Sequence, residues 1–456
     1  MRLWVAFLTA VFLCLGPGSA LGGSPPLTLA EAMLLALKEN PGLKAAGLTV
    51  EAAEAETAKA RARFLPQLNF TENYLFSDSP SQVFMSKLNQ RRFQANDFLL
   101  DNLNHPKPYG DFRSSLTLSQ PLFQAGEAAL GYQQAQLGRE MAGALVLGRR
   151  QQLLFQVTEA YFGLQLAQEK LIVMTQARDT AQAHLHMIES RHREGAVIKA
   201  DVLSAQVHLA RLTQERMTAA SRVEISRSAL DTVVGVPGVG NRTLAPAPRE
   251  PAPLPGKLEE LLDAARQNRP DLKRLALAAQ VAQQEYTKAR LNYLPRVRVT
   301  ASYDVDQRRL FGSSGDSYTV MALMNFNLFN GLADLARVRE SRAKETQARE
   351  LRRELEDRVR HQVKEAVLNL KTAHERLKVA QGAVDQAREG LRLIRLRYQE
   401  GLTILVDLLT SENALKDAES NRLAALFDTH LAQAGLELAL GTLTGPGAAP
   451  APKGAK

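Results

Sequence analysis

The sequence predicts an internally duplicated protein of the α plus transmembrane β class, in which long antiparallel helical hairpins are joined to four short strands. Three observations lead to this fold class. A helix–glycine–helix pattern occurs twice, and two long helix-forming stretches contain no proline. Four segments also alternate apolar and polar residues over about ten positions, the length that a tilted strand needs to cross a bilayer.

The duplication is clearest in two pairs of segments. RHREGAVIKADVL at 191–203 and RYQEGLTILVDLL at 397–409 share arginine, glutamate–glycine, aspartate and leucine, and lie 206 residues apart. NPGLKAAG at 40–47 and RPDLKRLA at 269–276 also match, but with a spacing of 229 residues. The difference places 23 additional residues in the first copy. We expect them in a loop within 77–112, because loops tolerate insertions.

The N-terminus has the pattern of a secretory signal. A basic residue, an apolar run over 3–16 and the small residues Ala20 and Gly22 predict a signal peptide at 1–22, cleaved after one of these two residues. The apolar run is shorter than the roughly 20 residues of a membrane-spanning helix. The single cysteine, Cys14, follows a leucine, so we do not expect lipid attachment. The mature chain should therefore contain no disulfide.

Very long helices are expected on both sides of each repeated glycine. Proline is absent from 122–236 and 296–445, and these stretches are rich in residues that favour helices. A helix over 333–398 would be about 100 Å long, far more than a globular domain needs. Gly195 and Gly401 interrupt the helical pattern, so the chain is expected to reverse direction there. The four expected helices are 127–194, 198–234, 333–398 and 404–440.

The four strand-like segments have a period of two. In RVRVTASYDVD, valine, alanine and tyrosine alternate with polar residues. Most aromatic residues of the chain lie near these segments, as in the aromatic girdles of outer-membrane barrels. The alternative is a pair of soluble hairpins packed on the helices. The expected strands are about 67–76, 113–123, 296–306 and 318–329.

Four strands are too few to close a membrane barrel. The smallest bacterial barrels have about eight strands, and an open sheet edge is not tolerated in lipid. If these strands cross a membrane, several chains must share one barrel.

Composition argues against other classes of protein. The net charge is +9, but basic and acidic residues are mixed along the helices, and no basic tract alternates with aromatics, so we do not expect nucleic-acid binding. No phosphate-binding loop or hydrolase motif occurs, so we expect no enzyme activity and no cofactor. His184 and His192 share a helical face, but no cysteine or acidic set completes a metal site, and we expect no bound metal.

These signals divide the chain into five parts. The signal peptide precedes a first repeat at 23–241 and a Pro-rich linker at 242–257. The second repeat covers 258–445, and a disordered tail is expected at 446–456.

The duplicated order of helix, Leu-Pro motif, strand, loop, strand and helix resembles that of the TolC-like outer-membrane efflux proteins, or outer membrane factors. The resemblance covers about 28–445 and includes both tip motifs and the glycines that end the return helices. It implies a homotrimer, with four strands per chain in a shared twelve-stranded barrel in outer-membrane lipid. The helical hairpins would form an α-barrel across the periplasm, and the 23 extra residues would be extracellular.

The function implied by the resemblance is passive export. The trimer would be the outer-membrane duct of a tripartite efflux or type I secretion system. It would receive substrate from an inner-membrane pump, of the RND or ABC type, through a periplasmic adaptor, also called a membrane fusion protein. The alternative is a periplasmic coiled-coil scaffold or an adaptor-like structural protein, which would fractionate with the soluble periplasm.

The resemblance also assigns residues to the periplasmic tip. The tip turns and the adaptor-docking surface would include residues of both hairpins, with His192 in place of the tyrosine in the first. They are Arg191, Gly195, Arg397, Tyr398 and Gly401.

Two aspartates are candidates for the pore mouth. Asp407 and Asp201 occupy matching positions in the two hairpins. Each either faces the pore, where a ring of carboxylates would concentrate cations, or caps its own helix. Some members of the family carry an arginine near Thr403 and a second aspartate near Thr410. This sequence has neither, so a doubled acidic ring is not expected.

Overall fold

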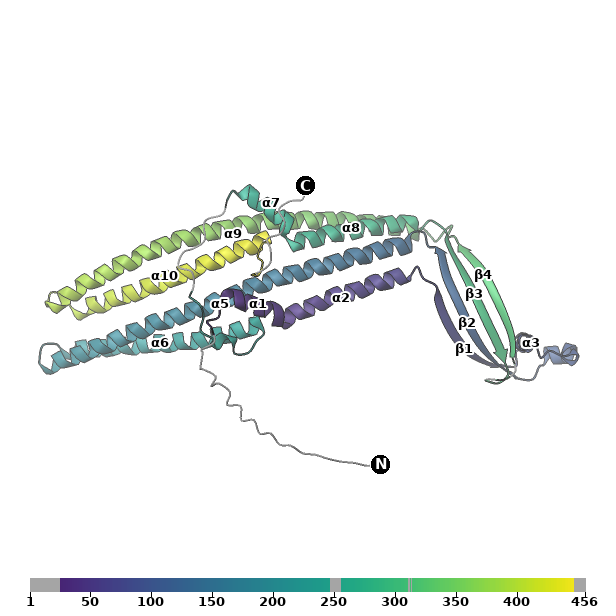
Figure 1. Ribbon diagram of the computed structural model, residues 1–456, viewed down its shortest axis with the longest axis horizontal. Helices are drawn as coiled ribbons and strands as arrows, with labels where there is room; N and C mark the ends of the chain where they lie inside the picture. The colour runs from purple at the N-terminus through teal and green to yellow at the C-terminus, as the bar shows by residue number, and fades with distance from the viewer. Residues whose placement is uncertain (1–24, 247–255, 311, 313, 447–456) are drawn as a thin grey trace, which may run out of the picture.

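The computed structural model describes residues 25–246, 256–310, 312 and 314–446, and it is drawn in Figure 1. The predicted signal peptide, most of the predicted linker and nearly all of the predicted tail lie outside these ranges, so those three assignments stay predictions. The described chain consists of two long helical hairpins, which end side by side, and a four-stranded sheet at the opposite end (Figure 1).

The two repeats match helix for helix. Each contains helices of 11, 22, 67 and 36 residues, in that order. Equal lengths allow both hairpins to span the same distance from the sheet to the tips. The first repeat has α1 (Leu29–Glu39), α2 (Pro41–Ala62), α5 (Glu127–Arg193) and α6 (Lys199–Val234). The second has α7 (Leu258–Asn268), α8 (Pro270–Leu291), α9 (Ala333–Gln399) and α10 (Leu405–Leu440).

Local sequence signals begin and end these helices. Pro41 and Pro270 stand at the first position of α2 and α8, where the missing amide hydrogen is not needed. The α6 and α10 helices end at Gly235 and Gly441, whose φ values are 79° and 72°. A Cβ atom at Gly441 would also lie 2.8 Å from the backbone of Asn268, so a larger residue would disturb the contact with α7.

The sheet is antiparallel in the order β1-β2-β3-β4, with β1 (Gln67–Ser77), β2 (Tyr109–Phe123), β3 (Arg296–Gln307) and β4 (Ser314–Asn325). Two predicted boundaries are wrong. The β2 strand begins four residues before the expected start at 113, and β4 runs four residues earlier than the predicted 318–329. The reason for the second error is that Gln307 pairs with Ser314 across a short turn, which sets where β4 begins.

The segment after β4 leaves the sheet although its apolar alternation continues. Gly331 and Leu332 both have φ values of 68° and turn the chain into α9. The matching residues of the first repeat, Ala125 and Gly126, also have positive φ values before α5. The same left-handed turn therefore joins sheet and helix in both repeats.

The register gives the sheet one polar and one apolar face. Arg113 pairs with Asp306 on the polar face, and Leu116 pairs with Tyr303 on the apolar face. The apolar face is widely exposed in the single chain, with Phe70 68% and Tyr318 82% accessible. Exposed aromatic and aliphatic side chains on one face, opposite a polar face, are typical of strands that contact lipid.

The inserted residues of the first repeat are folded and do not form the simple loop that we expected. Between β1 and β2 lie α3 (Pro80–Asn89), the 3₁₀-helix η1 (Ala95–Phe98) and α4 (Leu100–Asn104). They lie at the end of the sheet farthest from the helical hairpins (Figure 1).

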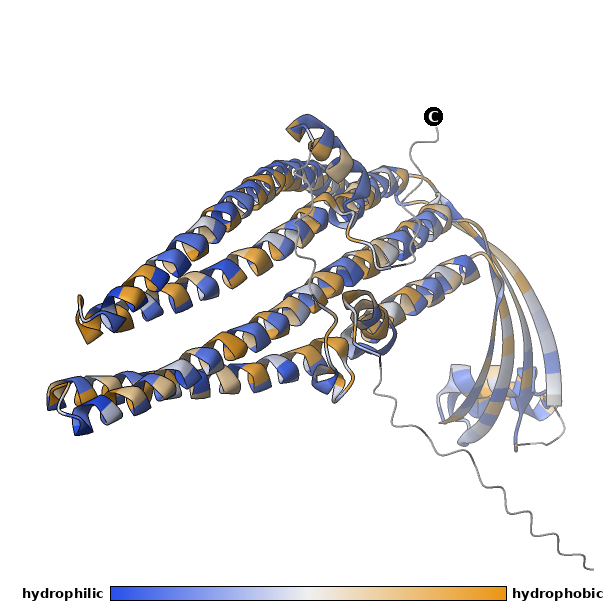
Figure 2. Cartoon of the chain, turned by 60° about the vertical axis from the view of Figure 1, so that its left-hand side comes forward, coloured by the Kyte–Doolittle hydropathy of each residue, from blue (hydrophilic) through white to orange (hydrophobic). Residues whose placement is uncertain are grey.

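The main core lies where α1, α5 and α6 meet. Leu27, Leu154, Leu164 and Leu230 are fully buried there. Figure 2 shows that hydrophobic and hydrophilic residues are interspersed along the whole length of the long helices. The helices therefore pack through narrow apolar stripes and leave polar faces exposed.

The chain after α6 returns to this core before any linker begins. Leu244 pairs with Leu27 in a parallel bridge, and Arg242 forms an ion pair of 2.7 Å with Glu31. The prediction that the linker starts at 242 is therefore wrong, because residues 242–246 belong to the folded first repeat. Composition alone did not reveal these contacts, because they join segments more than 200 positions apart.

Among the described residues, no helix is both long enough and apolar enough to span a membrane.

Candidate functional site: the hairpin tips and the joint below the sheet

Both hairpins reverse through the same hydrogen-bonded turn. Gly195 has a φ of 77°, and the amide of Ala196 donates to the Arg191 carbonyl over 2.8 Å. Gly401 has a φ of 72°, and the amide of Leu402 donates to the Arg397 carbonyl over 2.8 Å. This is the arrangement in which a glycine ends a helix and its next amide satisfies a carbonyl of the last turn.

The two tips pack against one another through a small apolar cluster. It combines buried side chains of three helices with the partly buried Tyr398 of α9. The cluster therefore joins the first hairpin to the second at their tips. The buried residues are Leu185 and Ile188 of α5, Val202 and Ala205 of α6, and Leu405 and Leu409 of α10.

Three of the residues singled out in the sequence meet at this contact. The guanidinium of Arg191 lies 5.8 Å from the centre of the Tyr398 ring, a cation–π distance. Burial raises the pKa of the Tyr398 hydroxyl; the positive charge of Arg191 opposes this shift, and the negative charge of Asp201 adds to it. Asp201 therefore lies within electrostatic reach of the opposite hairpin, which its position in the sequence did not reveal.

Asp407 occupies a different environment. It is exposed in the first turn of α10, and its carboxylate accepts a hydrogen bond from the Thr403 hydroxyl. A carboxylate in this position also interacts favourably with the helix dipole. The structure thus separates the two aspartates, since Asp201 is near the contact between the hairpins and Asp407 is near solvent. Arg397, in the last turn of α9, is also exposed.

A layer of charged residues lies farther along the hairpins and was missed in the sequence. Lys416, with only 8% of its side chain exposed, forms an ion pair of 2.7 Å with Glu215. Glu412 lies 3.1 Å from His184 of the first hairpin and 3.7 Å from Arg395 of the second. Breaking one partner of a buried pair is costly, because the other charge is left without compensation.

A signal for this layer was present in the sequence. Glu412 and Lys416 continue the three- and four-residue spacing of Leu405 and Leu409 along the buried face of α10. Charged residues in an apolar stripe indicate partners on a neighbouring helix. The identity of those partners could not be read from the sequence, because Glu215 is 201 residues from Lys416.

Acidification should destabilise this layer through His208. Burial lowers the pKa of His208, and the charges of Arg211 and Lys416 lower it further, against the opposing effects of Glu412 and Glu215. The folded protein binds this proton less tightly than the unfolded chain does. The contribution of neutral His208 to stability is therefore complete above the pKa of histidine in the unfolded chain, about 6.5. It is lost as the pH falls from there toward the lowered pKa of His208 in the folded protein.

The thermal midpoint should consequently fall more between about pH 7 and about pH 5 in the parent protein than in His208→Gln. Thermal unfolding at several pH values in detergent measures this difference. His361→Gln is the matched control, because the side chain of His361 is 78% exposed on α9. Equal pH dependence in the parent and His208→Gln would show that His208 is not the titrating group.

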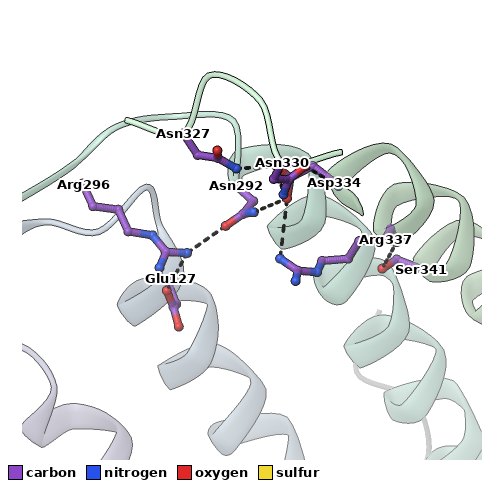
Figure 3. Close-up of polar contacts among 8 residues, drawn as sticks. All are labelled: Glu127, Asn292, Arg296, Asn327, Asn330, Asp334, Arg337 and Ser341. Atoms are coloured by element: carbon purple, nitrogen blue, oxygen red, sulfur yellow. Dashed lines mark hydrogen bonds and ion pairs between the residues drawn. The ribbon is translucent and has the colours of Figure 1, made fainter. Parts of the chain in front are cut away.

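A second polar centre joins the helices to the sheet (Figure 3). Asp334, only 5% exposed at the start of α9, accepts hydrogen bonds from the side-chain amides of Asn292, Asn327 and Asn330 at 2.6, 2.9 and 2.7 Å. Arg337 adds an ion pair at 3.7 Å. This joint brings together the end of α8, the segment after β4 and the first turn of α9.

The joint extends to the first repeat through a single arginine. Arg296, at the start of β3, donates to Asn292 over 2.8 Å and forms an ion pair of 3.2 Å with Glu127 of α5 (Figure 3). The first repeat has Ala128 at the position that matches Asp334. Among the residues that the structure describes, the joint therefore has no counterpart in the first repeat, and it was not predicted.

Comparison with known proteins agrees with this architecture. A family model described as outer membrane efflux protein matches residues 33–236 and 261–442. The chain is 25% identical to the alkaline protease secretion protein AprF of Pseudomonas aeruginosa, over 97% of this chain and 89% of that protein. It is 26% identical to the proteases secretion protein PrtF of Dickeya chrysanthemi, over 89% of this chain and 86% of that protein.

A solved structure has the same fold. The crystal structure of a membrane protein from Pseudomonas aeruginosa aligns with a TM-score of 0.78 and 19% identity, over 91% of this chain and 93% of that one. The predicted fold class and the resemblance to TolC-like proteins are confirmed. The chain belongs to the outer membrane efflux protein family, and it is an outer-membrane export duct that extends into the periplasm.

Proposed function

We propose that three copies of this chain form one duct. The observation that carries the proposal is the four-stranded sheet, whose outer strands β1 and β4 each have one edge without a strand partner in the described part of the chain. An unpaired edge is not tolerated in lipid, so these edges must pair between chains. In the order β1-β2-β3-β4, a β4 of one chain and a β1 of the next run antiparallel, and three chains would give twelve strands.

Mass determination in detergent tests this assembly. We expect a particle of three chains whose mobility in gel electrophoresis changes on heating. A particle of one chain that still conducts ions in a bilayer would contradict the proposal.

We infer that the cargo is polypeptide and that the pump is of the ABC type, as in type I secretion. The support comes from AprF and PrtF, whose names describe protease secretion and whose lengths the chain matches almost completely. Small-molecule efflux through an RND pump is the second candidate, because the outer membrane protein TolC of Vibrio cholerae is also similar, at 21% identity over 91% of each chain. In either case a periplasmic adaptor would bridge the pump and the duct.

Replacing the duct of a known protease-secretion system with this chain distinguishes the two candidate cargoes. The chain would be expressed in a strain whose own protease-secretion duct has been deleted, and protease would be measured in the medium. Secretion of protease supports polypeptide export. Restored resistance to small toxic molecules without protease secretion would favour efflux.

We also propose roles for the tips. Gly195 and Gly401 would form the two turns at the periplasmic mouth, and the exposed surface around Arg397 would contact the adaptor. Arg191 and Tyr398 would hold the two hairpins of one chain together. This assignment is supported by the apolar cluster beneath them and by the cation–π distance between them.

Asp407 is the aspartate that we place at the pore mouth. It is exposed, whereas Asp201 lies near Tyr398 in the contact between the hairpins. Three copies of Asp407 around the duct would form a ring of negative charge.

A further inference from the structure

The segment inserted between β1 and β2 has a small core of its own. Phe93 contacts both Phe84 and Phe98, with ring centres 4.7 and 4.9 Å apart and edge-to-face geometry. Lys87 forms an ion pair of 2.7 Å with Asp97, with both side chains mostly buried. Residues 78–108 therefore form a folded unit whose position relative to the sheet is defined.

This unit is attached to the polar face of the sheet. The amide of Gln90, 3% exposed, donates to the Asp111 carboxylate over 2.8 Å and to the Gly110 carbonyl over 3.1 Å. Its carbonyl oxygen accepts the Tyr109 hydroxyl over 2.9 Å. Tyr109, Asp111 and Arg113 are spaced two residues apart along β2, so their side chains lie on the same face of the sheet. This is the polar face, on which Arg113 pairs with Asp306.

The unit also crosses the end of the sheet to its far edge. Arg91 contacts both the carbonyl and the carboxylate of Asp316 in β4, each at 2.9 Å. A Cβ atom at Gly315 would lie only 1.8 Å from the carbonyl oxygen of Asn89. Gly315 also lies on the polar face, since it pairs with Asp306. The end of α3 therefore rests directly on the backbone of β4.

We propose that residues 78–108 form a cap inside the outer mouth of the duct. The polar face of a transmembrane barrel lines its interior, whereas the apolar face meets lipid. A unit attached to the polar face at the end away from the helices therefore occupies the exit. Three such units, one per chain, narrow the opening from inside, and large cargo leaves only after displacing them. This inference rests on the trimeric barrel of the proposed function.

The contacts identify a variant that should displace the cap without touching the cap residues. Gly315→Val places a branched side chain where the Asn89 carbonyl lies, so α3 must move away from β4. Ser317→Val is the matched control, because Ser317 has the same orientation two residues along β4 and its side chain is exposed. A second variant replaces 79–107 with the six-residue sequence of positions 308–313, which connects β3 to β4, and it serves if Gly315→Val does not fold.

The test measures access to the interior from outside intact cells, so it does not depend on whether the periplasmic mouth is open. The single cysteine, Cys14, lies within the predicted signal peptide, and Thr117→Cys would place one thiol on the polar face below the cap. Arg309→Cys, in the exposed turn between β3 and β4, controls for access at the rim. Each thiol is labelled with a small charged maleimide and with a maleimide carrying a large polyethylene glycol.

At Thr117→Cys, the large reagent should react about tenfold or more faster once Gly315→Val or the short turn is added, and Ser317→Val should have no effect. The small reagent should reach this thiol in every variant. At Arg309→Cys, each reagent should react at the same rate whether or not the cap has been displaced. Equal rates of the large reagent at Thr117→Cys in the parent and in both displaced variants would overturn the cap. If the small reagent reaches Arg309→Cys but never Thr117→Cys, the polar face is not an open interior, and the proposed barrel fails together with the cap.

Discussion

Asp407→Ala should raise the single-channel conductance of the duct and weaken its block by divalent cations. Three exposed carboxylates brought close together around the duct would repel one another and bind cations that block the mouth, and their removal takes this cation-binding site away. We expect the concentration of divalent cation needed for half-block to rise roughly tenfold. The measurement is planar-bilayer conductance with the cation added on the periplasmic side.

Two controls separate the pore role of Asp407 from its role at the helix end. Asp407→Asn removes the charge but retains an oxygen that accepts the Thr403 hydroxyl, so it should behave like Asp407→Ala if the charge is what matters. Asp201→Ala should change block much less, because Asp201 is only partly exposed and lies near Tyr398, whereas Asp407 is exposed. If Asp201→Ala changes both properties and Asp407→Ala neither, the pore-facing carboxylate belongs to the first hairpin. Failure of both Asp407 variants to assemble would show that helix capping is the main role.

Asp334→Ala should give the largest loss of stability. The substitution leaves three side-chain amides without the buried carboxylate that accepts their hydrogen bonds, and Arg337 without its partner, and it should lower the free energy of unfolding by about 3 kcal/mol. The thermal midpoint in detergent, followed by intrinsic tyrosine fluorescence or light scattering, measures this loss. Because the joint connects the end of α8, the segment after β4 and α9, we expect the sheet to separate from the helices here first in Asp334→Ala.

Asp357→Ala is the matched control for that substitution. Asp357 also lies on α9 and pairs with Arg360 at 3.2 Å, but both side chains are more than half exposed. A pair of this kind contributes at most about 1 kcal/mol, because water screens it. Asp334→Asn should fall between the two, since it keeps one acceptor oxygen and loses the charge. Equal midpoints for Asp334→Ala and Asp357→Ala would show that the joint does not stabilise the fold.

The sequence by itself determined the four long helices and the two turns between them. Glycine at a turn acts on the backbone of its own residue, so Gly195 and Gly401 can be read without knowing the fold. The constant spacing between the two copies predicted hairpins of equal length, and the structure has them. Alternating residues likewise predicted that strands exist, because the period of two is a property of a single strand.

Only the tertiary structure decided where those strands end and which side chains meet. The alternation of apolar residues continues past Asn325, and the antiparallel pairing with β3, from Gln307–Ser314 to Arg296–Asn325, sets where β4 begins and ends. Lys416 and Asp334 find their partners on other elements, and a charge in a sequence does not specify which distant group will compensate it. The difference between the two repeat spacings revealed that residues are inserted in the first copy. Their attachment to the polar face could not be predicted, because it depends on the hydrogen bond from Gln90 to Asp111, which exists only once the sheet has formed.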